Sequence, residues 1–113
     1  MGKPWINLGE REYYIYRIFC KDANIKNCYV GHTNSFVSRK GQHKYNCHND
    51  KRKHYNYKVY KMIRENGGWD NWNFEIIENI VCTRKEASER EQYWYNEFQA
   101  NMNSCIPCCH KLI

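Results

Sequence analysis

The sequence lacks any apolar run that approaches the roughly 18 residues a membrane-spanning helix needs. It also lacks the apolar core of a secretory signal peptide near its N-terminus. We therefore expect an intracellular protein, in the cytoplasm or the nucleus, that is neither secreted nor embedded in a membrane. Internal repeats, low-complexity tracts and linkers are missing too, and 113 residues suffice for one modest core but not two. This predicts a single domain over residues 1–113, with an irregular lead-in at 1–11 and a cysteine-rich tail at 105–113.

The sequence has seven cysteines, an odd number, and no signal peptide, which favours reduced thiols over disulfides. Cys20, Cys28 and Cys82 lie in apolar, strand-like contexts, where a free cysteine usually behaves as a small buried hydrophobe.

The tail carries a C-x-x-C-C-H motif, with the spacing of half a zinc site. A second C-x-x-C is missing, and adjacent Cys108, Cys109 and His110 cannot easily all point at one ion. Cys47 and His48 are the nearest candidates to complete a site. We interpret the tail as unpaired cysteines without zinc; a zinc-stabilised interaction module is the alternative.

The sequence contains 12 Asp and Glu but 18 Lys and Arg, which gives a net charge of +6. Such a surface suits a polyanion, most commonly nucleic acid, although many basic domains bind none. Contacts of this type are made to phosphates and are blind to sequence. The expected DNA-binding residues are Lys40, Lys44, Lys51, Arg52 and Lys53.

Local patterns predict two strands, two helices, a third strand and a third helix, an α+β domain in which helices pack on a small sheet. Thr33 and Asn34 are candidate caps of the first helix, Gly67-Gly68 ends the second, and Thr83 with Glu86 forms a capping box for the third. Trp72, Phe74 and Ile76 alternate with polar residues, as in a half-buried strand. The predicted ranges are strands at 13–20, 28–31 and from 72, helices at 35–45, 56–66 and 83–99, and an exposed loop at 46–53.

Several side chains have the chemistry of phosphodiester cleavage. Arg39 and His43 lie one helical turn apart on one face, with Cβ atoms roughly 6 Å apart, so a guanidinium and an imidazole could hold a phosphate and move a proton. Tyr16 and Tyr29 fall on adjacent strands. Glu91 precedes the large aromatics Tyr93 and Trp94 and should face the protein body, where a carboxylate can bind Mg²⁺. Each feature alone is more typical of packing or of a solvated surface.

Taken together, these residues resemble the GIY-YIG endonuclease family, including stand-alone catalytic domains of large DNA viruses and of homing endonucleases. Tyr14-Ile15-Tyr16 is similar to the first triplet of the family and Tyr29-Val30-Gly31 to the second, with Arg39 ten residues after Tyr29. The segment around Glu91 resembles the one that carries the metal-binding glutamate, and Asn103 the late asparagine. Tyr14 departs from the pattern, since the family has glycine there.

The resemblance implies a three-stranded, mainly antiparallel sheet and divalent-metal-dependent cleavage of DNA, in a process such as repair or recombination. Its catalytic set is Tyr16, Tyr29, Arg39, His43, Glu91 and Asn103, with Glu91 holding one Mg²⁺ or Mn²⁺. Either Tyr16 or His43 activates the water, with Tyr16 favoured. The substrate is DNA, recognised by its structure or through a targeting partner or a homodimer. A basic nucleic-acid-binding module that does not cut is the alternative.

Overall fold

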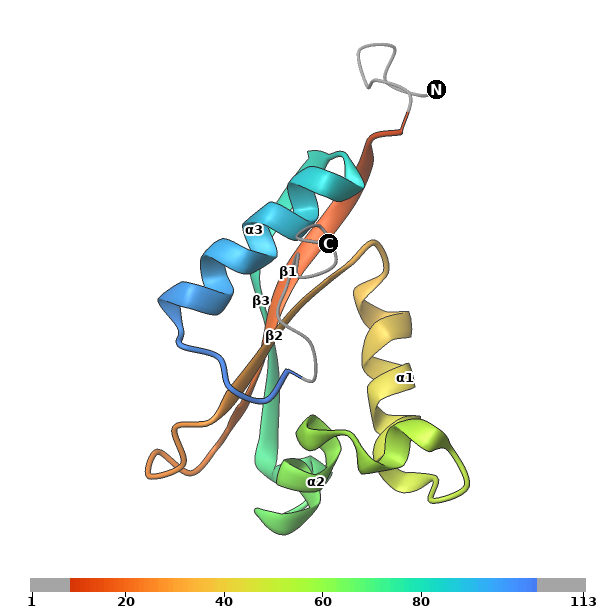
Figure 1. Cartoon of the computed structure of the whole chain (residues 1–113), viewed down its shortest axis with the longest axis vertical. Coiled ribbons are helices and arrows are strands. Elements are labelled where there is room, and N and C mark those ends of the chain that lie inside the picture. Colours follow the sequence, from red (N-terminus) through yellow and green to blue (C-terminus); the bar gives the residue numbers. More distant parts are fainter. Residues whose placement is uncertain (1–8, 104–113) are drawn as a thin grey trace, which may run out of the picture.

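Three strands form an antiparallel sheet in the computed structural model, which describes residues 9–103 (Figure 1). The strands are β1 (Arg11–Cys20), β2 (Cys28–Thr33) and β3 (Trp72–Cys82). Their order is β2-β1-β3, so β1 is central and pairs with both neighbours. The predicted α+β fold with a three-stranded antiparallel sheet is confirmed. The strand β1 starts earlier than expected, because Arg11 pairs with Cys82 at the far end of β3.

Helices cover both faces of the sheet. The helices α1 (Phe36–His48) and α2 (Lys58–Glu65) lie on one face and α3 (Arg84–Glu97) on the other (Figure 1). Two short 3-10 turns, η1 (Lys53–Asn56) and η2 (Trp69–Asn71), lead into α2 and β3. The element order is thus the predicted β-β-α-α-β-α.

Some predicted helix boundaries are wrong. The Thr33 hydroxyl accepts from the Ser35 amide at 3.1 Å in a short turn, so α1 begins at Phe36 without a side-chain cap. The helix continues to His48 through part of the predicted loop, because Cys47 is fully buried in the core. At the end of α3, Gln99 has a φ of 52°, a left-handed conformation that cannot continue a helix.

Other local signals are confirmed. Both hydrogen bonds of the Thr83–Glu86 capping box are present. Gly67 and Gly68 have φ values of 95° and 82°, and the Gly68 amide donates to the Ile63 carbonyl at 2.9 Å, which closes α2 as expected of C-terminal glycines.

The core is divided between the two faces of the sheet. Tyr16, Ile18 and Trp72 pack under α1 and α2, while Ile15 and Val30 pack under α3. The cysteines predicted to be buried, Cys20, Cys28 and Cys82, are buried and unpaired. Trp72 is buried as predicted, but Ile76 is 44% exposed, so the expectation that Ile76 shares the buried face of the strand is wrong.

The zinc motif of the tail lies outside the described residues. Cys47 is enclosed in the core, whereas the His48 ring is exposed and bonds the Lys44 carbonyl at 2.8 Å through Nδ1. No group of three or more His, Cys, Asp or Glu side chains within residues 9–103 is arranged to hold a metal. In the same range, none of the helices is both long and apolar enough to cross a membrane.

Candidate active site

Tyr16 lies at the centre of a cluster of aromatic side chains between β1, β2 and α1. It is only 1% exposed, and its hydroxyl lies 2.7 Å from Nε2 of His43. The ring of Tyr29 lies 6.1 Å from the Tyr16 ring and 5.4 Å from the His43 ring. The register explains the meeting of the two triplets, because β1 and β2 pair Tyr16 with Gly31, two residues from Tyr29 on the same side of β2.

Gly31 permits this close packing. A Cβ built on it would lie 2.7 Å from the Tyr16 hydroxyl oxygen and 2.9 Å from Cε1 of Tyr29, closer than real Cβ atoms come. The glycine is required because the Tyr16 phenol lies against the backbone of β2.

Gly31→Ala should therefore displace both tyrosines and lower the cleavage rate by about 10²-fold, since a shift on the order of 1 Å in a site has that effect. Gly41→Ala is the matched control, because its Cβ would meet nothing within 4 Å. Cleavage of plasmid DNA by both variants, after circular dichroism has verified folding, tests this. Unchanged cleavage by Gly31→Ala would show that the Tyr16–Tyr29 geometry does not matter.

His43 is enclosed by tyrosines rather than presented to solvent. Its Nδ1 lies 2.7 Å from the Tyr60 hydroxyl, while Nε2 faces Tyr16. Burial and the Arg39 charge lower the pKa of His43 to about 4, so the ring is neutral at physiological pH. The sequence suggested an imidazole that holds a phosphate beside Arg39; the ring is instead enclosed between Tyr16 and Tyr60. Neutral imidazole has one donor and one acceptor, so Tyr16, His43 and Tyr60 form one directed chain.

Arg39 acts on this cluster through its charge. It is half-buried on α1, and its guanidinium offsets part of the effect of burial on the pKa values of Tyr16 and Tyr29. Burial dominates in both tyrosines: it holds the pKa of Tyr16 well above 10 and raises the pKa of Tyr29 to about 12. Both phenols are therefore protonated at neutral pH in the DNA-free protein.

Glu91 lies on α3 and contacts β2. It is 9% exposed, and its Oε1 lies 2.5 Å from Nδ1 of His32. The Glu91 charge raises the pKa of Tyr29, which links the carboxylate to the tyrosine cluster.

Glu91 does face the protein body, but not for the predicted reason. Tyr93 is 46% exposed, and the Trp94 indole donates to Glu78 at 2.7 Å rather than covering Glu91. Arg90 also binds Glu78, at 2.9 Å. The two aromatics belong to a separate network between α3 and β3.

Asn103 braces the free edge of β2. Its amide donates to the Val30 carbonyl at 2.7 Å and accepts from the Val30 amide at 3.2 Å. Asn101 accepts from the Cys28 amide at 3.2 Å in the same way. These asparagines hold the edge strand that carries Tyr29 and Gly31, as an added strand would.

Sequence reasoning missed Tyr60 and His32. Tyr60 falls in the apolar stripe of α2 and is 4% exposed, so its sequence context indicates core packing. Only the polar Tyr60 hydroxyl within that apolar stripe could have indicated a contact with the site. His32 directly follows the second triplet, and its position beside a candidate metal ligand depends on how α3 crosses the sheet.

The predicted DNA-binding residues are exposed but do not form one cluster with the buried site. Lys40 lies on α1 with Nζ 5.6 Å from the centre of the Phe74 ring, and Lys44 follows one turn later. The group at 51–53 lies after α1, where the Arg52 guanidinium packs 5.5 Å from the Tyr45 ring.

Comparison with known proteins identifies the family of this chain. The family model described as GIY-YIG catalytic domain matches residues 12–103, most of the chain. The chain belongs to the GIY-YIG family. This GIY-YIG domain is therefore a nuclease domain, a DNA endonuclease.

The fold of the GIY-YIG domain is similar to a solved structure of a mutant catalytic domain of intron endonuclease I-TevI. The TM-score is 0.67 at 22% sequence identity, over 84% of this chain and 95% of that one. No curated protein sequence matches this chain.

Proposed function

We propose that this domain hydrolyses DNA phosphodiester bonds by in-line attack of water, with a divalent cation held at Glu91. The observation that supports the proposal is the contact of Tyr16 with His43 between β1 and α1, beside the Tyr29 ring. Glu91 bonds His32, which directly follows the second triplet on β2. Cleavage yields one 3′ hydroxyl and one 5′ phosphate.

The donor set suits a hard cation that keeps most of its water. Glu91 Oε1 is engaged by His32, which leaves Oε2 for an ion. Mg²⁺ is typically bound by one or two carboxylates together with waters and substrate phosphate, and a single buried carboxylate meets that requirement. When bound, Mg²⁺ or Mn²⁺ would supply Lewis-acid polarisation of the phosphate and stabilise the leaving 3′ oxygen. His32 is a positioning residue, since it fixes the orientation of the Glu91 carboxylate.

Tyr16 accepts the proton of the attacking water while it passes its own proton to Nε2 of His43. A standing phenolate is unfavourable because burial holds the Tyr16 pKa well above 10. The concerted transfer avoids that species. In the tautomer with Nε2 unprotonated, Nε2 takes this proton while Nδ1–H passes its own proton to the Tyr60 oxygen and Tyr60 releases its hydroxyl proton to solvent. No imidazolium, which the His43 pKa of about 4 disfavours, is then left behind. The departing 3′ oxygen takes a proton from solvent.

Arg39 and Tyr29 act on the phosphate itself. The Arg39 guanidinium neutralises charge that builds on the non-bridging oxygens, a contribution often worth about 3 kcal/mol at such sites. Tyr29 stays protonated, with a pKa of about 12, and can donate a hydrogen bond to the phosphate or to the water. Asn103 contributes indirectly, by holding the β2 edge.

Targeting is expected to come from DNA structure, from a partner protein or from a homodimer that cuts both strands. The exposed basic residues, Lys40, Lys44, Lys51, Arg52 and Lys53, supply phosphate contacts without base readout. Such contacts make binding fall steeply with salt.

Removal of divalent ions tests the proposal. Dialysis against EDTA should abolish nicking of supercoiled plasmid, and Mg²⁺ or Mn²⁺ should restore it, because the Arg39 guanidinium supplies charge but not the Lewis acid that Glu91 would hold. Metal analysis of the dialysed protein should find no retained zinc. Cleavage that survives EDTA would contradict metal dependence, and zinc that resists dialysis would favour a zinc-stabilised module.

A further inference from the structure

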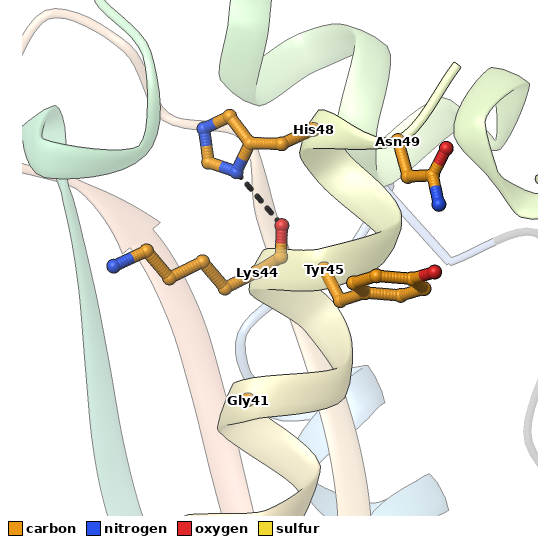
Figure 2. Close-up of a pocket in the computed structure, with 5 residues that line it drawn as sticks. All are labelled: Gly41, Lys44, Tyr45, His48 and Asn49. Atoms are coloured by element: carbon orange, nitrogen blue, oxygen red, sulfur yellow. Dashed lines mark hydrogen bonds between the residues drawn. The ribbon is translucent and has the colours of Figure 1, made fainter. Parts of the chain in front are cut away.

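The outer face of α1 carries an exposed aromatic ridge that the catalytic site does not use. Tyr45 follows the buried His43 by two residues, which turns it about 200° around the helix, and it is 55% exposed. It separates two open hollows of about 480 and 510 Å³, both of which it lines together with Gly41. Figure 2 shows the first hollow, in which Lys44 and His48 extend to one side of the helix and Tyr45 to the other.

Gly41 has no structural reason to be glycine. It lies inside α1, where glycine costs about 1 kcal/mol relative to alanine. A Cβ there would meet no atom within 4 Å, and its φ is not in the left-handed region. A residue that weakens its own helix without a packing reason indicates a functional surface. Its effect is to keep the floor of both hollows open, one turn before Tyr45.

The charge around the ridge favours a polyanion. Lys44 and His48 line the first hollow, while Arg52 and His54 line the second. No Asp or Glu lines either hollow. The acidic residue nearest to them in the sequence is Asp50, in the turn after α1. The Arg52 guanidinium lies 5.5 Å from the Tyr45 ring and lines only the second hollow, so the side of the ring toward the first hollow is open.

We propose that the Tyr45 ridge binds unpaired nucleotides, with one base stacked on Tyr45 over the first hollow and phosphates next to Lys44 and Arg52. An exposed aromatic ring flanked by cations is the combination that binds single-stranded nucleic acid without base readout. Bases of an intact duplex cannot reach the ring, because they are stacked and paired. The inference rests on the proposed nuclease function and names its substrate class: DNA with an unpaired segment, such as a flap or a branch.

Binding of two probes by fluorescence anisotropy, without divalent ions, tests this. Tyr45→Ala should weaken binding of a labelled oligothymidylate by roughly tenfold and leave the affinity for a blunt duplex unchanged. Tyr93→Ala is the matched control: Tyr93 is also exposed, at 46%, and also carries a guanidinium, that of Arg90, 4.5 Å from its ring. It should bind both probes as the wild type does.

Gly41→Leu separates a binding role from a structural one. It should raise the melting temperature, because leucine is a better helix former, and yet weaken oligothymidylate binding by filling both hollows. Sedimentation should give the same oligomeric state for the wild type and for Tyr45→Ala. If Tyr45→Ala and Gly41→Leu both bind oligothymidylate normally, or if Tyr45→Ala instead disperses a dimer, the ridge is not a nucleotide site.

Plasmid nicking and oligothymidylate binding, measured side by side, keep the two proposals apart. The wild type should do both, whereas Glu91→Gln should bind oligothymidylate as the wild type does and fail to nick. A wild type that binds oligothymidylate through Tyr45 but does not nick would overturn the catalytic proposal alone. Normal nicking with unchanged oligothymidylate binding by Tyr45→Ala would overturn the ridge alone.

Discussion

Glu91→Gln should reduce DNA cleavage by on the order of 10³-fold or more, because a carboxamide of the same shape lacks the charge that holds a divalent ion. The variant should stay folded, since glutamine can still accept a hydrogen bond from His32. Its affinity for Mn²⁺, measured by isothermal titration calorimetry, should fall in parallel with the rate.

Glu78→Gln is the matched control. Glu78 is also partly buried, but it binds Arg90 and Trp94 in the network between α3 and β3. Those partners lower the pKa of Glu78, although burial opposes them, so the ionised form is favoured and its loss should lower the melting temperature. Cleavage should persist below that temperature. Equal loss of activity in both variants, or normal Mn²⁺ binding by Glu91→Gln, would argue against Glu91 as the metal ligand.

Tyr16→Phe should lower the cleavage rate by about 10²- to 10⁴-fold, the usual contribution of a positioned proton acceptor. The ring remains, so the core under α1 is retained and only the hydroxyl is removed. Single-turnover rates with saturating enzyme measure the chemical step without interference from DNA binding. A loss smaller than tenfold would rule out the Tyr16 hydroxyl as the group that activates the water.

Tyr60→Phe tests whether cleavage depends on the whole Tyr16–His43–Tyr60 hydrogen-bonded chain or on Tyr16 alone. It should slow cleavage by roughly tenfold, because Nδ1 of His43 then lacks a buried partner. Wild-type activity should hold as the pH falls below 6.5 and decline only near 4, where a proton on His43 blocks Nε2. A decline centred near 6.5, together with an unaffected Tyr60→Phe variant, would contradict the enclosed neutral imidazole.

Much of the fold follows from local chemistry that the sequence displays. The Thr83–Glu86 box and Gly67-Gly68 act through backbone groups within a few residues, so their effects are readable from spacing alone. The end of α1 was not readable in this way. Asn46–His48 looks like the start of a polar loop, and the helix extends because Cys47 meets a core assembled from distant segments.

The sequence predicted only those contacts of the candidate site that join motif residues on elements adjacent in the chain. Tyr16, Tyr29 and His43 meet as expected because a hairpin and the next helix must adjoin. Tyr60 and His32 were missed since their partners are 17 and 59 residues away. The low pKa of His43 could not be foreseen either, as it depends on burial that three separate elements create.

The most direct test of the catalytic assignment is nicking of supercoiled plasmid in Mg²⁺ by the wild type and by Arg39→Ala, side by side. Arg39 is half-buried and not part of the core, so the variant should fold, which its circular dichroism spectrum can verify. The wild type should nick the plasmid, and Arg39→Ala should be slower by at least about 10²-fold. Equal nicking by the two proteins would contradict the site described for this domain.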